Sequence, residues 1–180
     1  MSSICRRAGV LLALLAVVVI GGAGTVGAQP AQPAHSTGSA VPALAGAFFK
    51  VVNQNSGKCL DVRREDPKPG ASVQQYRCTG TDNQLWSAVP VGNGVYTLVS
   101  KESGLCMASF LFNLMVVNTC NGVPGQQWRA VPAGFEWSEL RSNGLNQCTT
   151  VRSSSTADSA VIEQSACNGL PSQHWQFVTV

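Results

Sequence analysis

The sequence has few charged residues, and this shortage excludes several classes of function. Only 12% of its 180 residues are Asp, Glu, Lys or Arg, and the formal net charge is +3. No cluster of Lys and Arg is present that could neutralise a run of phosphates, so a nucleic-acid partner is not expected. The densest charge cluster, VRRED at 62–66, is balanced in sign and is expected to be a solvated loop.

Residues suited to catalysis or metal binding are scarce as well. Two histidines are present, His35 close to the N-terminus and His174 close to the C-terminus. The acids are scattered across predicted turns, and no nucleophile with a neighbouring base is recognisable. The cysteines lack the close paired spacing of zinc sites. We therefore expect no enzyme activity, no metal and no cofactor.

A long hydrophobic run occurs at the N-terminus, where residues 8–20 are almost wholly apolar. Arg6 and Arg7 precede this run, and small residues follow it up to Ala28, which is the three-part pattern of a secretory signal peptide. A membrane anchor is the alternative, but the run is short for a span of about 20 residues. We predict a signal peptide over 1–28, a secreted, extracellular protein, and no membrane partner after cleavage.

The segment after the predicted cleavage point, residues 29–46, is rich in Pro, Ala, Ser and Gly. This composition cannot bury enough apolar surface to offset its ordering entropy, so it predicts a flexible leader. Residues 47–180 remain, a length that suits one domain. Removal of Arg6 and Arg7 from the twelve basic residues leaves ten against nine acidic residues, so the mature chain is nearly neutral.

The sequence does contain a threefold internal repeat. Gln-x-Trp occurs three times, in NQLW (83–86), GQQW (125–128) and SQHW (172–175), and a pair of cysteines precedes each motif. The predicted repeats span about 47–90, 91–132 and 133–180. Apart from Cys5, which lies in the predicted signal peptide, six cysteines remain and allow fifteen pairings. The repeats favour one disulfide in each, which suits an oxidising compartment and would contribute roughly 3 kcal/mol to stability. The predicted disulfides are Cys59–Cys78, Cys106–Cys120 and Cys148–Cys167.

Short segments rich in Val, Phe, Tyr and Trp, bounded by Gly, Asn, Ser or Pro, predict an all-β fold. These segments are residues 48–54, 86–91, 95–101, 114–118, 128–133 and 175–180. No helical periodicity is found outside the predicted signal peptide. Three repeats are fewer than the usual blades of a propeller, so we expect them to close around a pseudo-threefold axis. Trp86, Trp128 and Trp175 would then point inward and fill the centre.

The pattern SGKCLDV…GASVQQYRC…DNQLW resembles one repeat of the ricin B-type lectin domain, a β-trefoil built from three Gln-x-Trp repeats. The resemblance covers 47–180. It implies a module that binds carbohydrate, of galactose or xylose type, with up to one shallow pocket per repeat. In the family's pattern this pocket uses the acid of CLDV, a Gln and an aromatic before the second cysteine, and the Asn-Gln of the turn.

Only the first repeat fills this pattern completely, and the resemblance assigns its pocket to Asp61, Gln74, Tyr76, Asn83 and Gln84. A carboxylate accepts strong hydrogen bonds from sugar hydroxyls, and an aromatic ring packs against the C–H face of a sugar. The other two repeats have lost both groups, so we expect one working pocket. The corresponding positions are Ala108, Val116, Asn118, Gly125 and Gln126 in the second repeat, and Thr150, Glu163, Ser165, Ser172 and Gln173 in the third.

A second function from a different class agrees with the same fold. A secreted β-trefoil can bind a protein target, as a peptidase inhibitor does, with a vestigial sugar pocket, because a fold does not determine a function. The complete set of pocket residues in the first repeat favours carbohydrate binding over this alternative.

Overall fold

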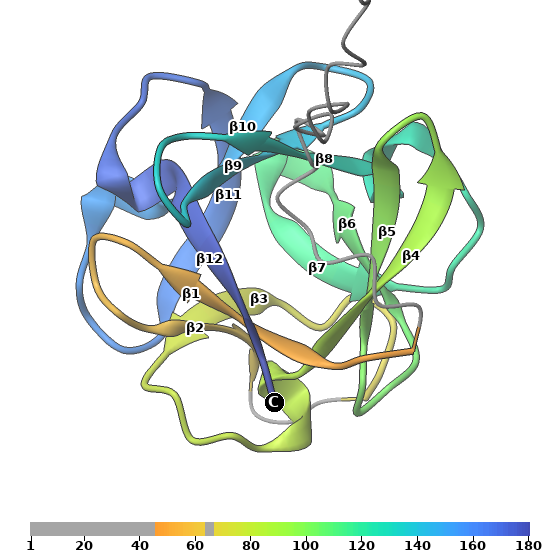
Figure 1. The fold of residues 1–180 in the computed structure, drawn as a ribbon. Coiled ribbons are helices and arrows are strands. Elements are labelled where there is room, and N and C mark those ends of the chain that lie inside the picture. Colours follow the sequence, from red (N-terminus) through yellow and green to blue (C-terminus); the bar gives the residue numbers. More distant parts are fainter. Residues whose placement is uncertain (1–45, 64–66) are drawn as a thin grey trace, which may run out of the picture. The chain divides into compact units, whose positions relative to one another are not determined.

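The computed structural model describes residues 46–63 and 67–180 (Figure 1). The predicted signal peptide and all of the predicted leader except its last residue lie outside this part of the chain. Within it the chain forms twelve β-strands and five short 3-10 helices. No helix in the described part is long and apolar enough to span a membrane.

Each repeat consists of four strands, and all six segments predicted as strands contain one, which confirms the all-β fold. The strands of the first repeat are β1 (Phe49–Asn53), β2 (Cys59–Val62), β3 (Val73–Tyr76) and β4 (Trp86–Gly92). Those of the second are β5 (Val95–Ser100), β6 (Cys106–Ser109), β7 (Met115–Asn118) and β8 (Trp128–Pro132). Those of the third are β9 (Ser138–Ser142), β10 (Gln147–Val151), β11 (Ala160–Ala166) and β12 (His174–Thr179). The 3-10 helices are η2 (Asp82–Gln84), η3 (Leu111–Asn113), η4 (Pro124–Gln126), η5 (Arg152–Ser154) and η6 (Pro171–Gln173).

Six of the strands close into a barrel. β1 pairs with β12, and the pairing continues through β9, β8, β5 and β4 back to β1. Closure of this kind reduces the number of free strand edges. The barrel is built from the first and last strands of each repeat, so residues far apart in the sequence lie side by side in it.

The other six strands form three hairpins, β2–β3, β6–β7 and β10–β11, one from each repeat. The hairpins meet one another, because β11 pairs with β3, Ser72 bridges to Val116, and Leu114 bridges to Glu163. In Figure 1 the three repeats, coloured orange to lime, green to teal and teal to blue, surround a common axis. This arrangement is a β-trefoil, as the threefold repeat predicts.

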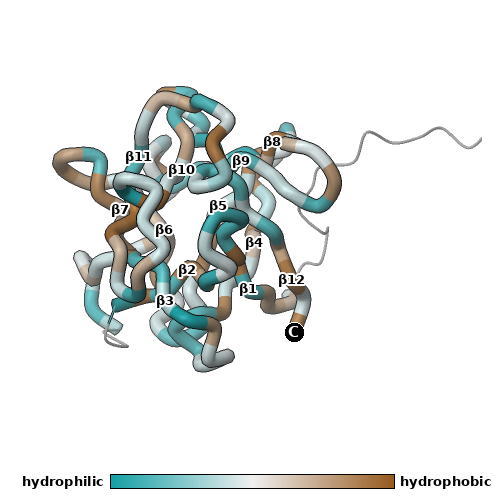
Figure 2. The backbone as a smooth tube through the Cα atoms, turned by 90° about the vertical axis from the view of Figure 1, so that its left-hand side faces the viewer, coloured by the Kyte–Doolittle hydropathy of each residue, from teal (hydrophilic) through white to brown (hydrophobic). Residues whose placement is uncertain are grey.

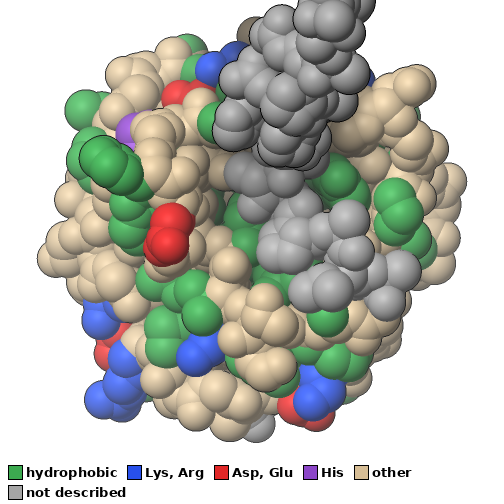
Figure 3. Space-filling model, viewed as in Figure 1, with side chains coloured by type: hydrophobic (Ala, Val, Ile, Leu, Met, Phe, Trp, Pro, Cys, Tyr) green, Lys and Arg blue, Asp and Glu red, His purple; other side chains and the backbone are tan. Residues whose placement is uncertain are grey.

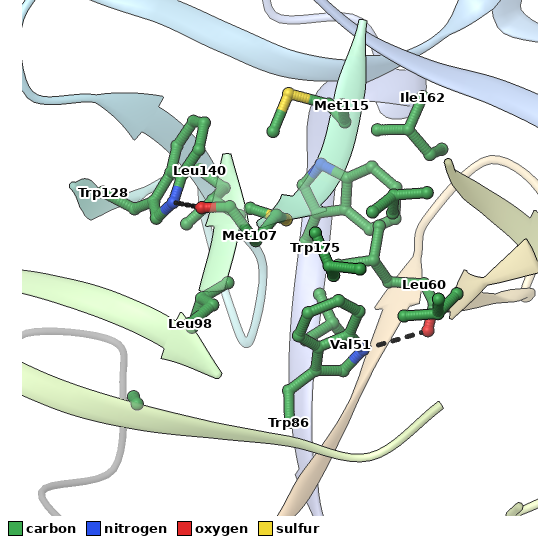
Figure 4. Packing of buried hydrophobic residues seen from close by; sticks show 14 of the residues in the cluster. Val51, Leu60, Trp86, Leu98, Met107, Met115, Trp128, Leu140, Ile162 and Trp175 are labelled. Carbon is green, nitrogen blue, oxygen red and sulfur yellow. Dashed lines mark hydrogen bonds between the residues drawn. The ribbon is translucent and has the colours of Figure 1, made fainter. Parts of the chain in front are cut away.

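The three tryptophans of the Gln-x-Trp motifs are fully buried in one hydrophobic core, as expected (Figure 4). Aliphatic side chains from all three repeats, among them Val51, Leu98 and Leu140, pack in the same core. Each indole Nε1 also donates to the carbonyl oxygen of the residue that follows the first cysteine of its repeat, which joins the core to the hairpin. The bonds are Trp86 to Leu60 (3.1 Å), Trp128 to Met107 (3.2 Å) and Trp175 to Thr149 (2.9 Å).

One disulfide lies within each repeat, which confirms the predicted pairing. The bonds join Cys59 to Cys78, Cys106 to Cys120 and Cys148 to Cys167. In each pair the first cysteine is buried in a hairpin strand, and the second lies just beyond the strand that pairs with it.

The glutamine of each Gln-x-Trp motif holds the chain on both sides of the second cysteine. Its Nε2 donates to the carbonyl oxygen of the residue before that cysteine, and its Oε1 accepts from the N–H of the residue after it. The donor bonds reach Arg77, Thr119 and Ala166, and the acceptor bonds come from Thr79, Asn121 and Asn168. Gln84, Gln126 and Gln173 are all buried, so these amides have a structural role in every repeat.

Candidate functional site

A pocket of about 470 Å³ lies on the first repeat. β2, β3, the loop after β3 and η2 form most of it, and the third repeat completes its wall. Four of the five residues predicted to bind sugar line this pocket, so the fold brings together positions that are up to 22 residues apart in the sequence. The lining residues are Asp61, Arg63, Gln74, Tyr76, Thr79, Thr81, Asn83 and Ser159.

Asp61 is the residue to which the polar groups of the pocket converge. It pairs directly with Gln74 in the β2–β3 hairpin, so both side chains point to the same face, and Gln74 Nε2 donates to its Oδ1 at 2.8 Å. Oδ2 accepts from Asn83 Nδ2 and Gln84 Nε2, each at 2.9 Å. Asp61 is only 3% exposed, and a buried carboxylate needs such donors. These bonds hold the carboxylate in a fixed orientation.

Two neighbouring amides of η2 have different positions relative to the pocket. Asn83 lines it, donates a second bond to Val62 O at 3.0 Å and accepts one from Thr81 Oγ1 at 2.6 Å. Gln84 is fully buried and does not line the pocket, because its amide is occupied by Asp61 and by the loop around Cys78. In the structure Gln84 therefore orients Asp61 from the protein side, and its predicted contact with a sugar stays a prediction.

Gln74 has an unused acceptor in the pocket wall. The residue is 6% exposed, and its Oε1 has no hydrogen-bond partner among the described residues. A buried polar atom without a partner costs about 1–3 kcal/mol. A ligand hydroxyl that donates to this oxygen would remove that cost.

Tyr76 supplies the aromatic wall of the pocket, and a neighbouring ion-pair network holds it. Arg77 Nη2 donates to its Oη at 3.0 Å, and the Arg77 guanidinium carbon is 5.2 Å from the ring centroid. Asp158, from the third repeat, accepts from the Arg77 backbone N–H at 3.1 Å and from Lys58 Nζ at 2.6 Å. The hydrogen bond from Lys58 lowers the pKa of Asp158 below its ordinary value, and the bond to Tyr76 raises the pKa of Arg77.

Four lining residues, Arg63, Thr79, Thr81 and Ser159, are not among those predicted from the sequence. Arg63 and the two threonines lie within four residues of a cysteine or of Asn83, so their spacing could have indicated them. Ser159 has no such signal, because it comes from the third repeat. Its backbone N–H donates to Gln75 O at 2.9 Å, at the point where β11 pairs with β3.

A family model for the ricin-type beta-trefoil lectin domain matches residues 47–175. The chain belongs to this family. A search of curated proteins gave no significant match. Among solved structures, the chain is similar to ThreeFoil, a designed threefold symmetric protein, with 32% identity over 74% of this chain and 99% of that one, and a TM-score of 0.71.

Two natural proteins with solved structures are also similar to this ricin-type domain. An exo-beta-1,3-galactanase from Clostridium thermocellum has 30% identity and a TM-score of 0.72, over 76% of this chain and 31% of that chain. The C-half of an earthworm R-type lectin, solved in complex with GalNAc, has 17% identity and a TM-score of 0.64 over 74% of this chain and 99% of that one. At 17% identity, the similarity to the earthworm protein is evidence of a shared fold only.

The hairpin registers of this ricin-type domain establish which positions correspond in the three repeats. Asp61 pairs with Gln74 in the first repeat, as Ala108 pairs with Val116 in the second. In the second repeat the position of Asn83 is held by Gly125, and a Cβ there would lie 2.9 Å from Ser109 Oγ. The second repeat therefore lacks both the carboxylate and the amide, and any side chain at 125 would require Ser109 Oγ to move.

The third repeat has replaced the pocket contacts by bonds within the protein. Thr150, in the position of Asp61, pairs with Glu163, and Glu163 Oε2 accepts from Arg152 Nε at 2.5 Å. Ser172, in the position of Asn83, is bonded through its hydroxyl to Ser154 at 3.0 Å. Glu163 and Ser172 thus already have hydrogen-bond partners within this repeat.

Outside this pocket, the charges on one face are mixed in sign, and the one set of possible metal ligands in the described part of the chain includes a disulfide. On the face shown in Figure 3, acidic and basic side chains of the described residues are interspersed and form no continuous basic patch. Within the described part of the chain, one group has metal-ligand spacing, Glu139 with Cys148 and Cys167. Both thiols of this group are joined in a disulfide, so they are not free to coordinate a metal.

Proposed function

We propose that this chain is a secreted, non-catalytic carbohydrate-binding module with one working sugar pocket, in its first repeat. A signal peptide of 1–28 and a leader of 29–46 would precede the binding domain of 47–180, and three disulfides suit an oxidising, extracellular location. The observation that carries the proposal is the orientation of Asp61 by three amide donors in a pocket that Tyr76 also lines.

The pocket groups match the surface of a sugar. Asp61 accepts from a ring hydroxyl, and Gln74 Oε1 accepts from another. Thr79 and Thr81 at the rim can donate or accept, and the Tyr76 ring packs against the C–H face and excludes water. Because the groups are held by bonds within the protein, little conformational entropy is lost on binding.

The pocket is suited to binding and not to hydrolysis. Cleavage of a glycosidic bond ordinarily uses two carboxyl groups that flank it. Among the described residues that line the pocket, Asp61 is the only carboxylate, so the pair of carboxyl groups is incomplete. Similarity to an exo-beta-1,3-galactanase at 30% identity favours a galactose-type ligand for this module.

Titration calorimetry with methyl galactoside tests the proposal. A shallow pocket with few polar contacts is expected to bind a monosaccharide at about millimolar Kd, near −4 kcal/mol, with one site per chain. Tyr76→Ala should weaken binding about tenfold or more. The matched controls are Asn118→Ala and Ser165→Ala, at the corresponding positions of the other repeats, and neither should change Kd. Two or three sites per chain, or equal losses in the controls, would contradict a single pocket.

Binding of a protein target is the second candidate function, and one surface feature favours it. The connection between β6 and β7 is mostly hydrophobic at the left edge of Figure 2, and its residues Phe110, Leu111 and Phe112 are 53%, 65% and 88% exposed. Exposed apolar groups of this size often mark interaction sites. Absence of sugar binding in the wild type, together with binding of a protein target that Phe112→Ser removes, would replace the first candidate by this one.

A further inference from the structure

The sugar pocket contains one basic side chain whose charge is not balanced within the described structure. Arg63 lines the pocket and is exposed. It takes part in no ion pair among residues 46–63 and 67–180. Asp61, the other charged residue of the lining, has its oxygens directed to Gln74, Asn83 and Gln84.

The third repeat shows what an arginine at this position binds. Arg63 and Arg152 each stand four residues after the first cysteine of their repeat. Arg152 Nε lies 2.5 Å from Oε2 of Glu163, so its partner is a carboxylate. Glu163 occupies the place of Gln74, because it pairs with Thr150 as Gln74 pairs with Asp61.

The first repeat therefore has the arginine of this pair without the carboxylate. Gln74, a neutral amide, takes the position of Glu163, and its Oε1 is buried without a partner in the described part of the chain. The second repeat has Phe110 at the arginine position and offers no charge at all. In the first repeat, an open pocket occurs together with an arginine that has no ion-pair partner among residues 46–63 and 67–180.

We propose that the pocket of the first repeat takes an acidic saccharide, a uronic acid whose carboxylate pairs with Arg63 as Glu163 pairs with Arg152. The inference rests on the proposed sugar-binding function and names its ligand class. A guanidinium matches a carboxylate through two parallel N–H donors, which makes the pair specific as well as attractive. The ring hydroxyls of the same sugar bind Asp61, and the carboxylate lies toward Arg63 at the open rim.

The test compares two ligands that differ only at C6, methyl galacturonoside and methyl galactoside, by titration calorimetry on the mature protein. The wild type is expected to bind the acid about tenfold more tightly, which corresponds to about 1.4 kcal/mol. This preference should shrink as the salt concentration rises, because an exposed ion pair is screened. The preference is measured as a ratio of two Kd values, so a change that affects both sugars equally cancels.

Two matched variants locate the preference. Arg63→Gln should bring the ratio close to one. Arg152→Gln removes the same charge from the third repeat, where Glu163 already neutralises it, and should leave the ratio at about ten. Both arginines are exposed, and a melting curve for each variant checks that the domain is folded.

The outcomes that overturn the inference are distinct from failure of the proposed function. Equal binding of the two sugars by the wild type would show a working pocket that does not recognise a carboxylate. If the preference for the acidic sugar survives Arg63→Gln, another group in the protein causes it. If it falls equally in Arg152→Gln, the net charge of the protein causes it. Binding of neither sugar by the wild type would remove the proposed function, and this inference with it.

Discussion

Gln84 Nε2 lies 2.9 Å from Oδ2 of Asp61, and the same nitrogen lies 2.9 Å from the carbonyl oxygen of Arg77. One amide thus connects the acid of the pocket to the chain beside the disulfide. Gln126 and Gln173 make the corresponding bond to the chain but have no acid to hold. The glutamine of the motif therefore holds the backbone in all three repeats, and in the first repeat it also orients the Asp61 carboxylate.

Asp61→Asn tests this connection. The asparagine would present an amide group to three amide donors, so at least one buried donor loses its acceptor. We expect a loss of about 1–3 kcal/mol in the free energy of unfolding and at least a tenfold loss of sugar affinity. Urea denaturation and calorimetry measure the two effects. Asp82→Asn, a surface acid paired with Lys101, is the control and should cost less than about 1 kcal/mol with unchanged binding.

Trp128 offers the opposite separation of effects. It is fully buried in the core, belongs to the second repeat and does not line the pocket of the first repeat. Trp128→Ala is expected to destabilise the domain by about 3–5 kcal/mol and to leave sugar affinity unchanged where the variant is folded. Trp128→Phe, which mainly removes the bond to Met107 O, should cost less. Loss of sugar binding in the folded variant would contradict independent repeats.

The disulfides are expected to contribute similarly to stability but differently to binding. Cys59–Cys78 and Cys106–Cys120 close segments with sequence separations of 19 and 14, so removing either pair to alanine should cost roughly 3 kcal/mol. The first pair borders Tyr76 and Thr79, and its removal should also weaken sugar binding. Thermal unfolding and sugar titration of the two double variants check this, and equal binding losses would be evidence against the assigned pocket.

The contribution of Asp158 to stability should depend on pH. Its pKa in the folded protein lies below the ordinary value of 3.8, so its stabilising effect is complete above that value and is lost as the pH falls through the folded-state pKa. The difference in Tm between the wild type and Asp158→Asn should therefore be constant from pH 7 to about pH 5 and should shrink below 3.8. If this difference in Tm disappears already near neutral pH, a group other than Asp158 is responsible for the pH dependence.

Six strands could be recognised in the sequence by their runs of Val, Phe, Tyr and Trp, whereas others could not. β3, with the sequence VQQY, and β10, with QCTTV, carry polar residues that are buried. Gln75 in β3 is fully buried and donates to the carbonyl oxygens of Ser155 and Ala157, from another repeat. Because such a buried polar side chain finds its hydrogen-bond partners far away in the sequence, β3 has no local hydrophobic signal.

Local patterns were enough to predict the threefold fold, the disulfide pairing and the buried tryptophans, because each depends on spacing within one repeat. The position of each side chain around the pocket required the folded chain. Gln84 is buried beneath Asp61, while the third repeat contributes Ser159 to the pocket lining and Asp158 to the neighbouring Arg77. Pairing of β11 with β3 brings them there, across about 80 residues of sequence, and such a contact exists only after the three hairpins have met.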